Sequence, residues 1–493
     1  MFDGQLFLLK VGSVSLMPGK SMSKLNRTIL AIALCVGAGT AQATDFKPCT
    51  DAASDATLAG SLCAREAVPG DPSGLAGGPA APLSLFVRKF PAQGAARGQV
   101  WLVAGGPGES GSSFYGMLPT LRRAFPGFDL VMPDHRGTGF STRMCPAEEA
   151  VDSPGGAALE GAEWGSCFQY LNGRPAYARQ FSQTNAAHDL KGLIERTPHQ
   201  GKTYLYGVSY GTQLVLRTVA MGAKVDGVVL DSLVPLQGDA TADLSRLSLV
   251  ADAVGREILA DCERGPCGER IGEPIEPLLR RVLARAETEP ALLANVPGKN
   301  LKRFFGALLD FPSAASRIPE MVKELDAGQD TVLKEVLADV ERQNASFGNF
   351  PQRPPSMPLV ILISGSENNL QPGRTIEEVQ QEEAGLLFSS SIPGHLVGNP
   401  IPLYERDAWF ERLPARLPPM LVIHGDRDGK TSHDGAVRHI EALRKAGPVR
   451  LFTAKGGGHF LLWSDGACSE AEVRQFVLGE QAPQRCETIA RSH

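Results

Sequence analysis

Short apolar runs alternate with longer amphipathic stretches along most of this chain. Strands this continuously apolar are typical of a parallel sheet that is buried on both faces, and the stretches between them supply the helices that cover it. The pattern therefore predicts an α/β fold with a mostly parallel sheet and helices on both faces. The apolar runs that predict strands are residues 83–90, 100–104, 129–133, 203–206, 227–230, 420–424 and 449–453.

The alternation stops between Pro235 and Pro418. The sequence of this region predicts helices, except for one apolar run at 359–364 that predicts a strand. The chain has 493 residues, which is longer than one compact domain usually is, and 43% of them are hydrophobic, which is enough for a large core. We therefore expect a mostly helical cap inserted into the core. The predicted segments are a loop-rich leader at 44–82, a first core part at 83–237, the cap at 238–415 and a second core part at 416–493.

The first 43 residues resemble an export signal that begins inside the numbered chain. Lys24 and Arg27 precede the apolar run 29–36, and the small-residue sequence Ala-Gln-Ala ends at Ala43. Charged, apolar and small-residue regions in this order predict a secretory signal cleaved after Ala43, and the apolar run is too short to span a bilayer. We expect an exported protein, periplasmic or secreted, with no stable membrane anchor.

The cysteine content is also consistent with an exported protein. Of nine cysteines, Cys35 lies in the predicted signal, and the eight that remain indicate disulfides in an exported chain. Neighbours along the chain suggest the pairs Cys49 with Cys63, Cys145 with Cys167, Cys262 with Cys267, and Cys468 with Cys486. Free buried thiols are the alternative. A zinc site is disfavoured because the pairs lack Cys-x-x-Cys spacing and clustered histidines.

The net charge of -5 arises from interspersed charges of both signs. Without a basic stripe, nucleic acid is not an expected partner. The sequence suggests no metal and no organic cofactor, and it does not indicate an oligomeric state.

The stretch from Thr203 to Thr212 predicts a buried strand, a tight turn and the start of a helix. Ser209 occupies the turn, between Gly207 and Gly211. A serine on a sharp strand-to-helix turn is a nucleophile elbow, and glycines two positions away let neighbouring backbone approach. Ser209 is therefore the predicted nucleophile.

A serine nucleophile needs a base and an acid that orients it, which follow in the order Ser, Asp, His in this topology. Asp428 comes directly after the strand run 420–424, and His459 follows three glycines after the run 449–453. Asp426 is the rival acid, but it lies close enough to the strand to be a structural loop residue. We predict the triad Ser209, Asp428 and His459.

The oxyanion formed during attack needs backbone N–H donors. One predicted donor is the amide of Tyr210, next to the nucleophile. The other is the amide of Gly106, in a glycine-rich loop that follows the strand run 100–104. A plain turn is the alternative for this loop.

Five motifs follow one another in order along the chain. They are Gly-Gly-Pro-Gly-Glu-Ser-Gly at 105–111, Asp-His-Arg-Gly-Thr-Gly-Phe-Ser at 134–141, Gly-Val-Ser-Tyr-Gly-Thr at 207–212, Val-Val-Leu-Asp-Ser-Leu-Val-Pro at 228–235, and Gly-Gly-Gly-His at 456–459. Together they make the chain resemble exported α/β-hydrolases of the proline iminopeptidase and tripeptidyl aminopeptidase family. The resemblance begins near residue 83 and includes Cys468 and Cys486, which resemble the tripeptidyl-aminopeptidase-like C-terminal segment. It implies an α/β-hydrolase fold with a helical cap, aminopeptidase activity, and the same triad.

The segment Ser364 to Asn369 departs from the family, where a cysteine often precedes an acidic pair. Glu367 matches the first acid, and Asn368 replaces the second. In relatives such carboxylates hold the substrate's α-ammonium, so Glu367 is predicted either to bind substrate or to be a structural carboxylate.

We therefore predict a serine hydrolase that cleaves short peptides near a free N-terminus through an acyl-enzyme. The alternative is an esterase, or an amide or lactone hydrolase, acting on a small molecule, because this fold supports many chemistries. A non-catalytic binding protein on the same scaffold is a third alternative, which an intact Ser, Asp and His disfavours.

Overall fold

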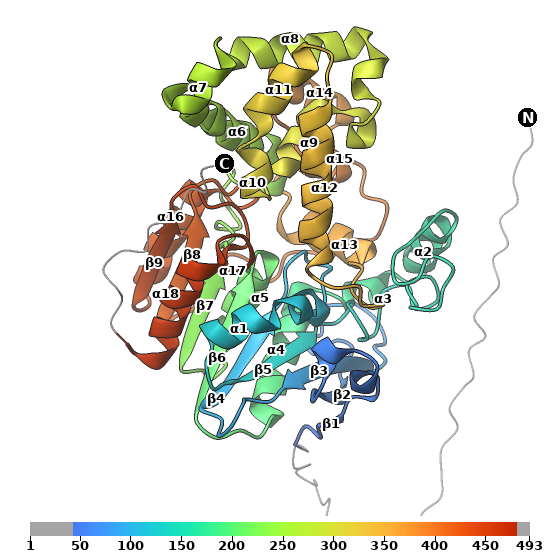
Figure 1. The fold of residues 1–493 in the computed structure, drawn as a ribbon. Helices are drawn as coiled ribbons and strands as arrows, with labels where there is room; N and C mark the ends of the chain where they lie inside the picture. The colour runs from blue at the N-terminus through green and yellow to red at the C-terminus, as the bar shows by residue number, and fades with distance from the viewer. Residues whose placement is uncertain (1–42, 481–493) are drawn as a thin grey trace, which may run out of the picture. The chain divides into compact units, whose positions relative to one another are not determined.

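A computed structural model describes residues 43–480 of the chain. These residues form a nine-stranded sheet in the order β1-β2-β3-β5-β4-β6-β7-β8-β9 (Figure 1). The predicted signal peptide up to residue 42 and Cys486 lie outside the described residues. No helix between residues 43 and 480 is long and apolar enough to cross a membrane. The strands are β1 Lys47–Pro48, β2 Leu62–Val68, β3 Leu83–Phe90, β4 Gly98–Val103, β5 Asp129–Asp134, β6 Lys202–Val208, β7 Gly227–Asp231, β8 Met420–Gly425 and β9 Val449–Ala454.

Strands β5, β4, β6, β7, β8 and β9 run parallel to one another. Strands β1, β2 and β3 form an antiparallel edge, and β3 also pairs antiparallel with β5. The side chains of β4 alternate between the two faces. Val100 and Leu102 belong to one buried cluster, and Trp101 and Val103 to the other. A strand buried on both faces needs apolar residues at every position, which explains the continuous apolar runs. The predicted mostly parallel α/β fold is confirmed.

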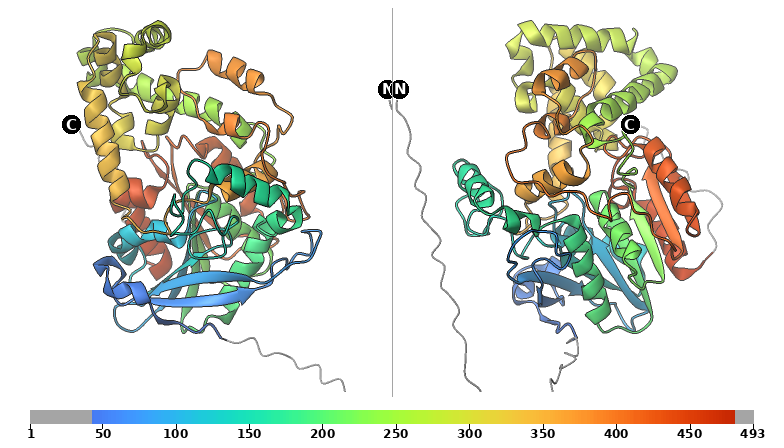
Figure 2. Two further views of the ribbon diagram at one scale, coloured as in Figure 1. Left: turned by 90° about the vertical axis from the view of Figure 1, so that its right-hand side faces the viewer. Right: turned by 180° about the vertical axis from the view of Figure 1, so that it is seen from behind.

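Helices cover both faces of this sheet (Figure 2). Buried side chains of α4 (Gln183–Arg196), α5 (Tyr210–Ala220) and α16 (His433–Arg444) pack on one face. Those of α1 (Leu118–Ala124), α17 (Leu461–Ser464) and α18 (Gly466–Leu478) pack on the other. Parallel strands need crossovers between them. Helices α1, α4, α5 and α16 lie in such connections, whereas α17 and α18 follow the last strand, β9.

The region after β7 folds into helices with an apolar cluster of their own. They lie at one end of the sheet (Figures 1 and 2). This cap contacts the core beside the carboxyl ends of the strands, where Lys430 pairs with Asp310 at 3.0 Å. The cap helices are α6 Leu247–Arg264, α7 Pro266–Ile271, α8 Ile275–Thr288, α9 Leu301–Leu308, α10 Pro312–Ala315, α11 Ile318–Asp326, α12 Thr331–Ala345, α13 Met357–Glu367, α14 Ile376–Ala384 and α15 Ile392–His395.

One sequence prediction about local structure is wrong. The run 359–364 is not a strand but lies inside helix α13, whose second residue is Pro358. A short apolar run has no periodicity that separates a buried strand from a buried helix, and four of the six residues of this run are buried. Besides its loops, the leader at 44–82 contributes β1 and β2 to the sheet edge.

The cysteine pairing is largely as predicted. Cys49 is bonded to Cys63, Cys145 to Cys167, and Cys262 to Cys267. Cys468 is also disulfide-bonded.

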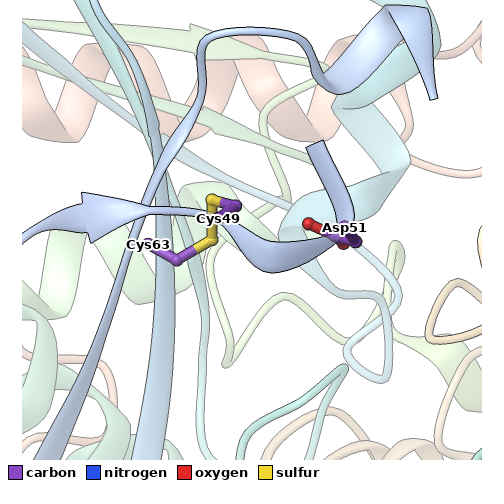
Figure 3. A group of neighbouring side chains, drawn as sticks. All are labelled: Cys49, Asp51 and Cys63. Carbon is purple, nitrogen blue, oxygen red and sulfur yellow. A yellow bond between two sulfur atoms is a disulfide. The ribbon is translucent and has the colours of Figure 1, made fainter. Parts of the chain in front are cut away.

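The first disulfide ties β2 to the segment before it, next to Asp51 (Figure 3). Within the described residues, Cys49, Cys63 and Asp51 form the one cluster of potential metal ligands. Both sulfurs are consumed by the disulfide, and Asp51 pairs with Arg88 at 2.5 Å. Since a metal is bound by thiolate, this cluster offers no cysteine ligand while it is oxidised.

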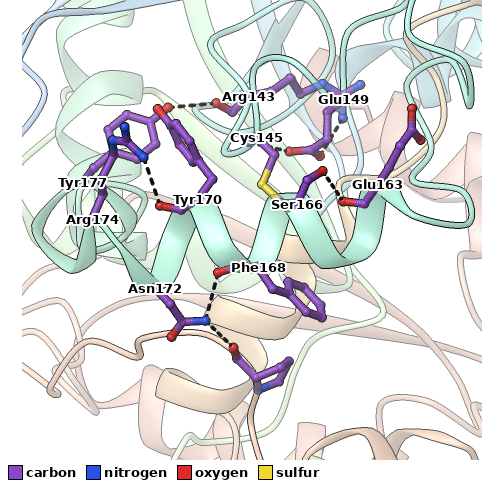
Figure 4. The surroundings of a disulfide bond; sticks show 12 residues. Arg143, Cys145, Glu149, Glu163, Ser166, Phe168, Tyr170, Asn172, Arg174 and Tyr177 are labelled. Carbon is purple, nitrogen blue, oxygen red and sulfur yellow. Dashed lines mark hydrogen bonds and ion pairs between the residues drawn. A yellow bond between two sulfur atoms is a disulfide. The ribbon is translucent and has the colours of Figure 1, made fainter.

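The second disulfide holds an arm between β5 and β6 that contains α2 (Glu163–Asn172) and α3 (Pro175–Arg179) (Figure 4). Asn172 Nδ2 donates to the carbonyl of Pro400, at 2.9 Å, so the arm also reaches the segment that follows the cap helices.

Candidate active site

Ser209 lies on the turn between β6 and α5. Its φ of 53° is in the left-handed region that non-glycine residues rarely adopt. The turn is compatible only with small neighbours, because a Cβ on Gly207 would lie 2.5 Å from the carbonyl oxygen of Gly211, and one on Gly211 would lie 2.4 Å from that of Val103. Strained backbone of this kind is concentrated at functional sites. The partly exposed Ser209 side chain thus lies at the carboxyl edge of the sheet.

The structure brings Asp428 and His459 together. Asp428 follows β8 and His459 follows β9, so both start from the same sheet edge as Ser209. His459 Nδ1 lies 2.8 Å from Asp428 Oδ2 and 3.0 Å from Oδ1. This contact assigns the proton to Nδ1, because an ionised carboxylate can only accept. Nε2 is left as an acceptor, and within residues 43–480 neither it nor the Ser209 hydroxyl has a hydrogen-bond partner.

Asp428 is held rigidly as well as paired. Its carboxylate is fully buried and accepts from the amides of Lys430 and Thr431, both at 2.8 Å, and from the Thr431 hydroxyl at 2.6 Å. Burial acts to raise the pKa of Asp428, but the charge and hydrogen bond of His459, the charge of His424 and the Thr431 hydroxyl hold it well below its ordinary value. Asp428 is therefore ionised at neutral pH.

The same pair controls the imidazole. Burial acts to lower the pKa of His459, but the Asp428 carboxylate outweighs burial, and the net pKa is raised. An imidazole with this pairing accepts a proton readily at neutral pH, which is what a general base requires.

The rival acid Asp426 has another contact. Its carboxylate accepts from the amide of Gly456 at 2.7 Å, which closes the turn before His459. The neighbouring His424 is fully buried, and its two ring nitrogens bond to the Leu233 amide and the Thr431 carbonyl. Both residues thus support the loops that present Asp428 and His459.

The two predicted oxyanion donors adjoin Ser209. Tyr210 is the first residue of α5, where an amide has no intrahelical partner. The loop of Gly106 approaches closely, since a Cβ on Gly105 would lie 3.1 Å from the Ser209 Cβ. In the described part of the chain, the amides of Gly106 and Tyr210 donate to no other protein group.

Charged residues that sequence reasoning missed surround His459. Glu109 is half-buried and follows the oxyanion loop, and a Cβ on Gly106 would lie 3.3 Å from its Cγ. Burial raises the pKa of Glu109, opposed by a hydrogen bond from Ser113 and by the charges of His459, Arg353 and Lys430. Glu109 lies inside a motif quoted above, so the sequence did contain a signal. Arg353 and Asp310 come from the cap, and only the folded chain brings them to this place.

Glu367 has a different environment from the triad. It is 2% exposed, and both of its carboxylate oxygens bond to Arg217, at 2.8 and 2.9 Å. Tyr404 and Gln237 also donate to it, at 3.0 and 2.7 Å. Burial acts to raise the pKa of Glu367, but Arg217 holds it below its ordinary value. Each oxygen thus has two partners, which fits the structural alternative for this residue.

Comparison with known proteins agrees with this fold. The family model described as alpha/beta hydrolase fold matches residues 100–466, and the chain belongs to this family. The serine protease Hip1 of Mycobacterium tuberculosis is 24% identical over 485 residues, which cover 90% of each chain.

Solved structures with the same fold are more distant. A bromoperoxidase from Bacillus anthracis is 14% identical, with a TM-score of 0.34, and covers 84% of this chain and 100% of its own. A proline iminopeptidase-related protein from Thermus thermophilus is also 14% identical, with a TM-score of 0.35, and covers 84% and 97%.

Proposed function

We propose that this alpha/beta hydrolase is an exported serine hydrolase that cleaves short peptides near a free N-terminus. The observation that carries the proposal is the contact of His459 Nδ1 with Asp428 at the sheet edge where Ser209 occupies a strained turn. An oriented base, a buried carboxylate and a nucleophile on three neighbouring loops form the arrangement that serine acyl transfer requires.

In the proposed mechanism, His459 Nε2 takes the proton of Ser209 as its Oγ attacks a carbonyl carbon. The amides of Gly106 and Tyr210 stabilise the oxyanion, and Asp428 stabilises the imidazolium. His459 then gives the proton to the leaving amine, which departs and leaves an acyl-enzyme on Ser209. A water molecule, deprotonated by the same imidazole, releases the acid.

We expect kcat/KM for an aryl ester to rise with pH, with a midpoint above about 6.5, the ordinary imidazole value. The reason is that only neutral His459 can accept the proton, and its raised pKa keeps it protonated to higher pH. Asp428→Asn should lower this midpoint and reduce kcat by about 10⁴-fold. Asp426→Asn is the control, because its retained amide oxygen still accepts from Gly456. An unchanged midpoint in Asp428→Asn would contradict the pairing.

The peptide specificity rests on coarser support. The five motifs resemble an aminopeptidase family, and a relative over 90% of the chain is named a serine protease. Export is supported by the three disulfides and the bonded state of Cys468, since disulfides persist in oxidising compartments.

One observation favours the alternative of an esterase or a hydrolase of small amides or lactones. The carboxylate that the family pattern suggests for ammonium binding, Glu367, already has Arg217 as its counter-charge. A substrate ammonium would then need another acceptor, whereas a neutral ester substrate would need no such acceptor.

Three substrates separate these two functions: a short peptide anilide with a free amino terminus, its N-acetylated twin, and an aryl ester, with Ser209→Ala as the control. We expect the free-amine peptide to exceed its twin in kcat/KM by a hundredfold or more, which corresponds to about 2.7 kcal/mol of transition-state discrimination. Cleavage of the ester alone would retain the serine hydrolase and overturn the aminopeptidase.

A further inference from the structure

The end of β7 lies between the two loops that carry the proposed nucleophile and base. Strand β7 pairs with β6 on one side and with β8 on the other. Its last residue, Asp231, is fully buried, and its carbonyl oxygen accepts the N–H of Ser209 at 3.0 Å. The backbone N–H of Ser209 is therefore held by Asp231.

The carboxylate of Asp231 points to the other loop. Its Oδ1 accepts the amide of Leu461 at 2.8 Å, and its Oδ2 accepts that of Leu462 at 3.0 Å. These are the first residues of α17, whose opening amides have no partners within the helix. Tyr206 adds a further donor, from its hydroxyl to Oδ2 at 2.8 Å.

Ser232 completes the tether one residue later. Its hydroxyl accepts the amide of Phe460, the residue directly after His459, at 2.9 Å. Its own amide donates to Ile423 of β8 at 3.0 Å. Ser232 and Phe460 both have a positive φ, 55° and 58°, so the chain is held out of its ordinary conformations on both sides of this contact.

We propose that Asp231 is a positioning residue that sets the separation of Ser209 and His459. Its carbonyl oxygen holds the backbone of Ser209, and its carboxylate holds the backbone that follows His459. The proposal rests on the proposed roles of those two residues. Asp231 touches neither substrate nor reacting atoms; it acts through the two loops. A displacement of about 1 Å between reacting groups can cost on the order of 10²-fold in rate, which makes such a tether functionally important.

The charge of Asp231 also reaches the base. Burial raises the pKa of Asp231, and its hydrogen bonds and the charge of His459 oppose this. The interaction is mutual, so the ionised Asp231 favours the protonated imidazole. Loss of this charge should therefore move the titration of His459, which a purely structural residue would not do.

The test is Asp231→Asn, measured with the aryl ester so that peptide specificity plays no part. We expect kcat to fall about 10- to 100-fold, KM to change less than about threefold, and the pH midpoint of kcat/KM to decrease. Asp226→Asn is the matched control: Asp226 lies at the opposite end of β7 and accepts the amide of Thr203 at 2.8 Å. It should leave kcat and the midpoint unchanged.

Titration with a phosphonate probe counts competent sites, so kcat can be expressed per folded molecule. A loss of kcat that matches the loss of titratable sites, with an unmoved pH midpoint, would overturn the positioning role. If Asp231→Asn does not fold, Ser232→Ala decides, because it removes the acceptor of the Phe460 amide and a 3.2 Å donor to Asp231 Oδ1, while the Asp231 carboxylate itself stays. Unchanged kcat in Ser232→Ala would also overturn the proposal. Wild-type ester hydrolysis that does not need Ser209 would instead refute the proposed function.

Discussion

Ser209→Ala should lower kcat/KM for the aryl ester by on the order of 10⁵- to 10⁶-fold, and adding His459→Ala should cost almost nothing more. In the proposed mechanism the two residues perform one proton transfer and one attack, so removing either removes both. The measurement is initial-rate hydrolysis of single and double variants, with thermal unfolding to show that the fold is retained.

A matched control for the histidine is His433→Ala. His433 lies near the same sheet edge, where its Nε2 is 3.3 Å from the Thr453 hydroxyl, and it makes no contact with Asp428 in the described structure. It should retain kcat/KM within about threefold. If the reductions in kcat/KM of the two single variants multiply in the double variant, Ser209 and His459 act independently, which contradicts the proposed triad.

Glu367→Gln should destabilise the protein by about 3–5 kcal/mol, because it leaves Arg217 charged and without its counter-charge in the interior. The side chains of both residues are 3% exposed, and the pair joins cap helix α13 to helix α5, which begins at the nucleophile turn. The measurement is the change in free energy of unfolding, taken from urea titration.

Glu335→Gln is the control for this prediction. Its pair with Arg317 has a similar distance, 2.8 Å, but the side chains are 56% and 34% exposed. Exposed pairs contribute about 0–1 kcal/mol, so this variant should unfold nearly as the wild type does. If Glu367→Gln instead has the free energy of unfolding of the wild type and loses activity only on free-amine peptides, Glu367 binds the substrate's ammonium and is not a structural carboxylate.

Local sequence was most informative where local geometry is most restricted. The glycines around Ser209 are needed because backbone comes within 2.5 Å of where their Cβ atoms would be, so the turn leaves a visible signature. The positions of Asp428 and His459 followed from the strands before them, because parallel strands deliver their ends to one edge. No tertiary information was needed for these predictions.

Other features had no local signature. The run 359–364 reads equally well as strand or helix, and only its packing against the cap and core settles that it is part of α13. Glu367 has a carboxylate that could serve a substrate or a structural partner, and the decision depends on Arg217, 150 residues earlier in the chain. Pairings over such separations are set by how the cap folds onto the core.

The amino-acid sequence by itself determined the mostly parallel α/β sheet, the strained turn at Ser209, and the loops on which Asp428 and His459 lie. These follow from hydrophobic periodicity and from steric limits on backbone, both of which act between near neighbours. Only the tertiary structure decided that Asp428 contacts His459 while Asp426 closes a turn, that Glu367 faces Arg217, and that Asp231 tethers both loops. Each of these depends on hydrogen bonds between distant segments, whose partners are chosen by burial and distance once the sheet and cap have assembled.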